Sequence, residues 1–214
     1  KRQGSSYQET EIASSFSSAT AIRSFLQSDG STEHPLLSAN LPETSLQLLK
    51  QCLENGRGPV FPDAFEQTIL YKIRTMDPQS LKQVPDVKEG LENRLAACAM
   101  KAGTLGELVN MVTTVRYPSV RIKRICANLL WGITKSSLQS FVDDESCGYL
   151  RVLGFNRKGR ELLQRINREG SLPLVTKVSN YRNQLSSLST EMFEYDIKAT
   201  DTYVLGFSNP AERY

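Results

Sequence analysis

A short segment near the start of the chain carries residue types that bind anions. Residues 18–23 read SATAIR, with hydroxyl groups at Ser18 and Thr20 and a guanidinium at Arg23. Apolar residues at i, i+3 and i+4 from position 22 predict a helix that begins here. A helix N-terminus offers unpaired backbone N–H groups to an anion, and Arg23, one turn after Thr20, can reach the same phosphate. Ser-rich helix starts are also ordinary N-caps, so the pattern is typical of a surface helix as well.

No second group of residues completes an active site. The three adjacent acids at 143–145 point in different directions and are typical of a solvated helix end. The single histidine, His34, precedes a proline in a polar loop. The four cysteines never form a Cys-x-x-Cys pair, so no zinc site can be assembled from local spacing. We expect free thiols in a reducing cytoplasm, no metal and no self-sufficient catalytic centre.

The stretch from Arg116 to Arg168 is the strongest charge feature of the chain. It contains eleven Lys or Arg residues and four acids, a net +7 in a chain of formal net charge +3, so the other residues sum to −4. This concentration is the usual electrostatic footprint of a polyanion site, most often for nucleic acid. The alternative is a solvated helix face. The predicted nucleic-acid contacts are Arg116, Arg121, Lys123, Arg124, Arg151, Arg157, Lys158 and Arg160.

Helices must position most of these residues. Apolar stripes and capping residues predict helices over 18–28, 41–55, 62–73, 77–84, 87–103, 104–115, 118–133 and roughly 187–205. The helix that starts at Pro118 has an apolar face and a basic face, which suits a helix that packs inward and presents cations outward.

The pattern changes after Gly148. Residues 149–154 and 173–178 are short, apolar and compatible with strands, and a helix that ends at 169–170 lies between them. A strand–helix–strand unit of this length can pair its strands in parallel. We therefore expect a minor parallel sheet at one end of a helical domain.

Composition and length set outer limits. A hydrophobic content of 39% and a charged content of 23% are typical of a soluble globular protein. No apolar run approaches the roughly 20 residues needed to span a bilayer, and no secretory signal is visible. The chain begins with Lys1 and not with Met. We expect it to be part of a longer cytoplasmic protein.

Several motifs in succession resemble one family. Residues 18–23 are similar to the Ser-x-Thr-x-x-Arg-type signature of HIGH-motif nucleotidyltransferases. The motifs KEGLENR, RYP, YLRVLGF, PLVTK and DIKA follow in order along the chain. Each motif is modest, but their order is fairly specific. Together they resemble the C-terminal half of bacterial tRNA(Met) cytidine acetate ligases, over nearly the whole chain.

The resemblance implies an ATP-dependent ligase that activates acetate as acetyl-adenylate and then acetylates the wobble cytidine of elongator tRNA(Met). It implies ATP contacts from Arg2, which matches the arginine upstream of the family's Ser/Thr motif, and from Ser18, Thr20 and Arg23. The family's Asn-Pro-Phe-His-x-Gly-His segment, which cradles the triphosphate, does not occur in these residues. We expect the chain alone to be inactive and not to hold ATP stably.

Together these patterns predict a mainly α-helical fold with a small β element, preceded by the tail end of an α/β nucleotidyltransferase domain. Residues 1–30 would be that remnant, and residues 31–214 a helical tRNA-binding domain. The expected partners are tRNA and acetate, with ATP as cofactor and no membrane. Two alternatives stay open: a non-catalytic helical module that binds RNA or protein, and a nucleotidyltransferase with a different acceptor.

Overall fold

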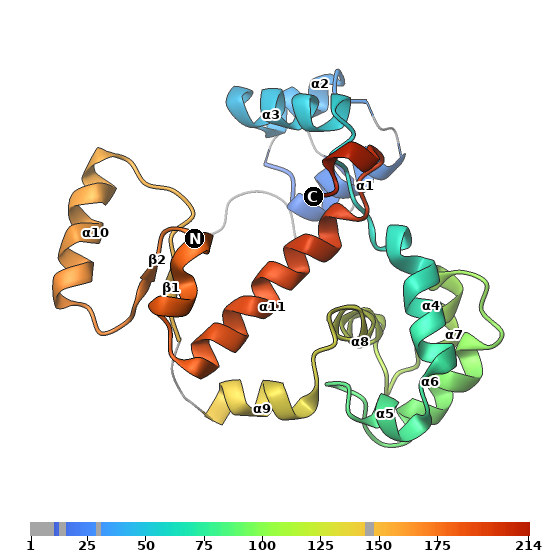
Figure 1. Ribbon diagram of the computed structural model, residues 1–214. Coiled ribbons are helices and arrows are strands. Elements are labelled where there is room, and N and C mark those ends of the chain that lie inside the picture. The colour runs from blue at the N-terminus through green and yellow to red at the C-terminus, as the bar shows by residue number, and fades with distance from the viewer. Residues whose placement is uncertain (1–10, 13–15, 29–30, 144–147) are drawn as a thin grey trace. The chain divides into compact units, whose positions relative to one another are not determined.

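The computed structural model describes residues 11–12, 16–28, 31–143 and 148–214, and most of them are helical (Figure 1). Contacts divide the chain into two compact units. The terminal unit consists of residues 1–64 and 203–214, and the central unit of residues 65–202. Each unit has buried apolar clusters of its own.

The terminal unit is built from short helices around a small core of Leu26, Leu37 and Leu46. Its second helix was not predicted, because six residues are too few for a helical period to show. His34 caps that helix by accepting a hydrogen bond on Nδ1 from the N–H of Leu36 at 3.2 Å. The described elements of the unit are α1 (Ala19–Ser28), α2 (Pro35–Asn40), α3 (Glu43–Glu54), most of the 3-10 helix η1 (Pro62–Phe65) and the 3-10 helix η3 (Pro210–Glu212).

The end of α3 anchors the C-terminal residues of the same unit. Gly56 follows α3 with a φ of +69°, and its carbonyl oxygen accepts from the N–H of Asn209 at 3.2 Å. Arg57 pairs with Glu212 at 2.5 Å. A Cβ atom at position 56 would lie 2.7 Å from Cβ of Asn209. Glycine is therefore required here for two reasons: the left-handed backbone and the close approach of the C-terminal segment.

Gly56→Ala should lower the free energy of unfolding by about 1–2 kcal/mol, because alanine is strained at positive φ and meets Asn209. Urea denaturation measures the loss, and hydrogen exchange of residues 209–212 should rise. Gly106→Ala is the matched control. It lies inside α7, where an added Cβ atom would be 3.9 Å from Oγ1 of Thr104, an ordinary contact distance. Alanine should therefore be neutral or slightly stabilising there. Equal losses in both variants would contradict the explanation.

Five helices of the central unit share one continuous core. Leu95, Leu108 and Ile122 are among its fully buried side chains. The predicted apolar stripes are found in these helices, although α6 begins at Leu91 and not at 87, because the preceding turn adopts positive φ angles. The helices are α4 (Glu66–Thr75), α5 (Pro78–Lys82), α6 (Leu91–Ala99), α7 (Leu105–Val112) and α8 (Ser119–Trp131).

The rest of the central unit contains the strand–helix–strand element and a second core. The parallel pairing predicted for the two strands is confirmed, with Leu150 opposite Leu174 (Figure 1). Each strand has only two residues. The second core is formed by Val175, Tyr181 and Phe193. The elements here are α9 (Lys135–Asp143), β1 (Leu150–Arg151), α10 (Arg157–Glu169), β2 (Leu174–Val175), the 3-10 helix η2 (Val178–Asn183) and most of α11 (Ser187–Val204).

The fold class predicted from the sequence is wrong in one respect. The part of residues 1–30 that the structure describes contains α1 and no strand, so it does not show the tail of an α/β domain. The reason is packing: Leu26 of α1 belongs to one core with Leu37 and Leu46. The compact units divide between residues 64 and 65. In the described ranges, β structure is limited to β1 and β2.

Candidate nucleic-acid interface

The N-terminal end of α1 brings together three of the residues predicted to contact ATP. Ser18 is buried, and its Oγ accepts a hydrogen bond from the N–H of Ala21 at 3.0 Å. Its hydroxyl therefore caps the helix. Arg23 donates to Oγ1 of Thr20 at 3.3 Å on the exposed side of the same helix. Thr20 and Arg23 are thus brought together where a phosphate can reach both. Arg2, the fourth predicted residue, lies outside the described residues.

Three arginines on and before α8 are held by the turn that precedes α6. Arg116 pairs with Glu89 at 2.7 Å, and Arg124 pairs with Asp86 at 2.5 Å. Arg121 donates two hydrogen bonds to the backbone carbonyl oxygen of Asp86, at 3.0 and 2.6 Å. These partners raise the pKa of Arg116 and of Arg124. All three predicted nucleic-acid contacts therefore also have a structural role.

That turn depends on α8 for its conformation. Asp86 and Glu89 have φ angles of +69° and +61°. Such angles are uncommon for residues other than glycine, although aspartate and asparagine adopt them more readily than glutamate does. The hydroxyl of Tyr117 donates to the carbonyl oxygen of Glu89 at 3.0 Å, and the guanidinium of Arg121 lies 5.4 Å from the centre of the Tyr117 ring. Reversing the charge of Arg121 would leave the Asp86 carbonyl without its donors. Such a change should destabilise the unit whether or not RNA binds there.

Asp86→Asn should cost about 0.5–1 kcal/mol of unfolding free energy at pH 7, because the lost ion pair is partly exposed. The hydrogen bond from Arg124, followed by the charges of Arg124 and Arg121, lowers the pKa of Asp86. The folded state thus binds this proton less readily than the unfolded chain. The stabilisation is therefore present above about pH 4 and is lost as the pH falls through the lowered pKa.

Urea unfolding of both proteins between about pH 7 and pH 2.5 tests this expectation. Asparagine tolerates positive φ, so the backbone of the turn should be kept. Asp201→Asn, at an exposed position of α11 without an ion pair to the described residues, is the control. A difference between wild type and Asp86→Asn that does not change with pH would show that the charge of Asp86 is irrelevant.

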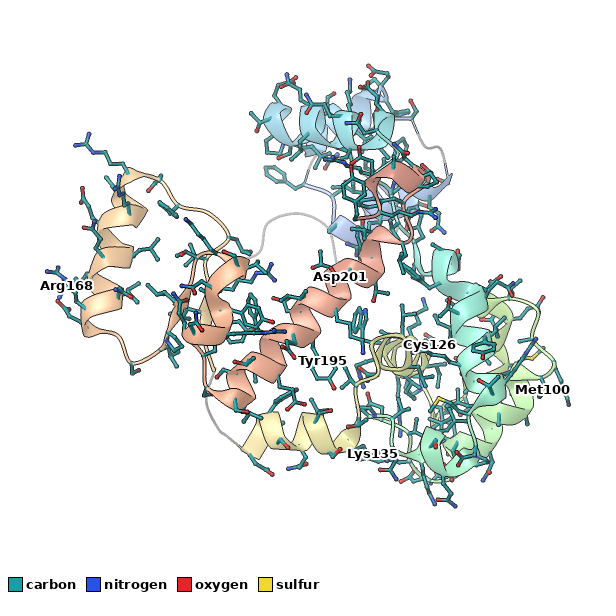
Figure 2. The ribbon with its side chains drawn as sticks, in the orientation of Figure 1. Met100, Cys126, Lys135, Arg168, Tyr195 and Asp201 are labelled. Atoms are coloured by element: carbon teal, nitrogen blue, oxygen red, sulfur yellow. The ribbon has the colours of Figure 1, made fainter. Side chains whose placement is uncertain are left out.

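Three further cations of the basic stretch also have partners within the protein. Lys135 at the start of α9 donates to two backbone carbonyl oxygens at 2.6 and 2.7 Å (Figure 2). Arg151 pairs with Asp196, and Arg165 pairs with Glu169 at 2.8 Å one turn later on the same helix. To bind a phosphate, each of these side chains would have to give up or share an existing contact.

Four cations of α10 differ from these. Their side chains are exposed and make no ion pair or hydrogen bond to the residues that the structure describes; they belong to Arg157, Lys158, Arg160 and Arg168. Figure 2 labels the last of them, Arg168. Three of them lie in the first turn of α10, where no acid is present. The helix dipole disfavours cations at this end. Their placement is therefore unfavourable for the helix alone and is best explained by an anion from outside. Lys123 on α8 is likewise exposed without such a contact.

Sequence reasoning missed Arg168 and gave all cations of the stretch equal weight. The amphipathic pattern of α10 is the sequence signal that could have distinguished its cations from the others. Its apolar residues recur at 162, 163 and 166, and most of its cations fall on the other side. The partners of Arg116, Arg121, Arg124 and Arg151 come from distant positions in the chain and could not be inferred from spacing.

Other candidate chemistries find no support within the described ranges. No group of three or more His, Cys, Asp or Glu side chains there is placed to hold a metal ion. Cys52, Cys98 and Cys126 are free thiols, and burial raises the pKa of Cys126 to about 11, which makes it a poor nucleophile. None of the described helices is both long and apolar enough to cross a membrane.

Comparison with known proteins identifies the family to which this chain belongs. The model of the HIGH Nucleotidyl Transferase family matches residues 1–214, and the chain belongs to this family. The chain is also similar to tRNA(Met) cytidine acetate ligases. It is 38% identical to that of Acetivibrio thermocellus over 214 residues, 100% of this chain and 52% of the relative. It is 37% identical to that of Thermoanaerobacter pseudethanolicus over 209 residues, 98% of this chain and 50% of the relative.

Solved structures show the same similarity. Apo Thermotoga maritima TmcAL (form I) superposes with a TM-score of 0.91 and 29% identity. The match covers 100% of this chain and 51% of the TmcAL chain. The form II structure, bound with alpha-thio ATP, has a TM-score of 0.85 and 30% identity. That match covers 93% of this chain and 49% of the TmcAL chain. The chain thus spans about half the length of the relatives that it matches.

These findings confirm the family inferred from the sequence and correct one expectation. The family model matches residues 1–214, the whole length of the chain. The expectation that the chain lacks the HIGH-motif domain, apart from the tail end of an α/β domain before its helical part, is therefore wrong. Residues before and after position 30 belong to the same family.

Proposed function

We propose that this chain is part of a cytoplasmic ATP-dependent ligase that acetylates the wobble cytidine of elongator tRNA(Met), and that its central unit holds the tRNA. The unpaired cations of α10 carry this proposal, because they are exposed and have no partner among the described residues. The names of the relatives supply the substrate. In the proposed reaction, acetate attacks the α-phosphorus of ATP and pyrophosphate leaves. The exocyclic amine of cytidine then attacks the acetyl carbonyl, loses a proton, and AMP leaves.

The internal contacts of the basic stretch suggest a ranking of its cations for tRNA. Arg157, Lys158, Arg160 and Lys123 can neutralise phosphates without breaking any bond that the structure shows. Arg116, Arg121, Arg124 and Arg151 already contact carboxylates or carbonyl oxygens. Because each of these contacts would have to be shared, we assign the second group a supporting role.

Salt dependence of tRNA binding tests the proposal. With four phosphates neutralised, affinity should fall about 100-fold between roughly 50 and 200 mM salt. The measurement uses the full-length protein and tRNA(Met), followed by an acetylation assay with ATP and acetate. Salt-sensitive binding without acetylation would favour a non-catalytic RNA-binding module or a different acceptor. Absence of tRNA binding would contradict the proposal.

We further propose that Thr20 and Arg23 contact a phosphate of ATP. A phosphate oxygen is a stronger acceptor for a guanidinium than the Thr20 hydroxyl that Arg23 now contacts. The similarity to the TmcAL structure bound with alpha-thio ATP supports a nucleotide site in such a protein. The Oγ of Ser18 accepts from the helix backbone, so its role would be to hold the turn in place.

Arg23→Ala should raise the KM for ATP about 10-fold or more, because a hydrogen bond to a charged group is lost. Steady-state acetylation kinetics measure this change. Lys50→Ala is the control, since Lys50 lies on α3 of the same unit and pairs with Glu33. An unchanged KM for ATP in Arg23→Ala would remove Arg23 from the site.

A further inference from the structure

The apolar side of α10 is uncovered in the structure. None of its residues is buried, although its apolar side chains lie on one face. Leu162 is 58% exposed, Phe155 just before the helix is 59% exposed, and Leu153 is 88% exposed. A helix of a folded protein usually buries such a face. We therefore expect a binding partner to cover the apolar face of α10.

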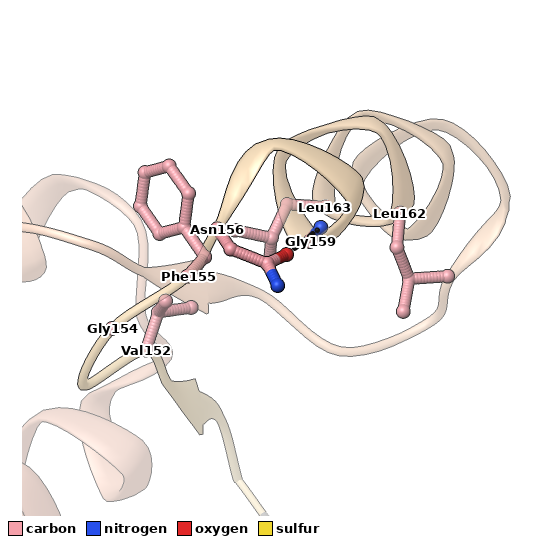
Figure 3. A pocket seen from close by; sticks show the side chains of 7 residues that line it. All are labelled: Val152, Gly154, Phe155, Asn156, Gly159, Leu162 and Leu163. Carbon is pink, nitrogen blue, oxygen red and sulfur yellow. Dashed lines mark hydrogen bonds between the residues drawn. The ribbon is translucent and has the colours of Figure 1, made fainter.

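The uncovered face is hollowed where β1 leads into α10. The hollow has a volume of about 450 Å³ and is lined by Val152, Gly154, Phe155, Asn156, Gly159, Leu162 and Leu163 (Figure 3). That volume lies within the range of small-ligand pockets. Asn156 accepts a hydrogen bond on Oδ1 from the N–H of Gly159 at 2.9 Å, which fixes its position at the rim. No lining side chain is an acid, a base or a nucleophile, so the hollow can hold a group but not react with it.

Cations lie at both borders of the apolar face. With 3.6 residues per turn, Lys158 falls beside Leu162 and Arg160 falls beside Leu163. Arg157 and Arg168 fall on the opposite side of the helix. The occupant must therefore combine a flat apolar part with negative charges close to it on either side. A nucleotide in a single-stranded segment has this chemistry, since its base is joined to phosphates on both sides.

Two other occupants fit less well. A membrane surface suits a continuous, convex apolar face, whereas Gly159 interrupts this one and the hollow is concave. A protein segment would need carboxylates at both borders to satisfy Lys158 and Arg160. An RNA backbone supplies phosphates at every nucleotide.

We propose that the hollow receives one unstacked base of a single-stranded RNA loop, with the flanking phosphates on Lys158 and Arg160. Phe155 offers a ring for stacking, and Leu162 and Leu163 form the apolar floor. This inference depends on the proposed function in one respect, namely that the partner is RNA. It adds that the protein binds a base of the RNA as well as its phosphate backbone, at a place without reactive groups.

The test compares two RNA hairpins that have the same number of phosphates, one with an intact loop and one whose loop nucleotides are abasic. Affinity of the full-length protein is measured by fluorescence anisotropy. Wild type should bind the intact loop about 10-fold more tightly, the effect of one base stacked on an aromatic ring.

Phe155→Ala should lose this preference and bind both hairpins equally, with the salt dependence unchanged. Leu162→Ala should reduce the preference. Circular dichroism checks that these variants at exposed positions stay folded.

Each outcome decides one question. If RNA binds but wild type does not distinguish the hairpins, the base site is wrong and the proposed tRNA role stands. If Phe155→Ala keeps the full preference, the base lies elsewhere and the inference is likewise wrong. If neither hairpin nor tRNA binds, the proposed function itself fails. Binding to phosphatidylserine vesicles in place of RNA would show that the helix face meets a lipid surface and would overturn the inference.

Discussion

Replacing Lys158 and Arg160 together with glutamate is expected to weaken tRNA binding by about 100-fold at moderate salt. Two charge-assisted contacts are lost, each contributing about 1.5 kcal/mol or more, and two repulsive charges are added. The salt dependence of log affinity should also become shallower by about two, because roughly 0.9 counterions are released for each phosphate contact. Filter binding or anisotropy over a series of salt concentrations measures both changes.

The matched control for this variant is Arg116→Glu with Arg182→Glu. It changes the net charge by the same amount, but both arginines already pair with acids at the surface, Glu89 and Glu194. We expect this control to change tRNA affinity by only a few-fold. If it weakens binding as much as the α10 variant, the total charge of the chain matters and the specific position of α10 does not.

Phe193→Ala should destabilise the second core of the central unit by about 3–5 kcal/mol, the usual cost of removing a fully buried phenylalanine. The Phe193 side chain is fully buried on α11, and its ring lies 5.1 Å from that of Tyr149 and 4.7 Å from that of Tyr181. These contacts hold the strands on either side of α10. Loss of the ring should therefore also release α10 and weaken tRNA binding.

Hydrogen exchange separates this local effect from general unfolding. Amides of residues 149–175 should exchange faster in Phe193→Ala, whereas those of α4 to α8 should change little, because they surround a different core. Tyr71→Ala, an aromatic side chain that is 67% exposed on α4, serves as the control and should stay within about 0.5 kcal/mol of wild type. Uniform acceleration across both cores would contradict the separation.

Much of the helical fold could be predicted from local patterns. The stripe of Leu91 and Leu95, the proline before α8 and the Asn55–Gly56 stop of α3 are signals that act within a few residues. The parallel pairing of β1 with β2 followed from the length of the intervening helix. The short helix α2 and the division between units could not be predicted in this way. The core contact of α1 with residues 37 and 46 depends on packing between separate elements.

By itself the sequence determined the helical character of the chain, its family resemblance and the presence of an excess of cations after position 116. These properties follow from residue type and spacing along the chain. Only the tertiary structure decided which cations are available to a partner. Asp86, Glu89 and Asp196 are brought by folding to Arg124, Arg116 and Arg151, whereas the first turn of α10 meets no acid in the described part of the chain. The reason is that ion pairing depends on distance in space, and charges far apart in sequence come within a few ångströms only after the core has formed.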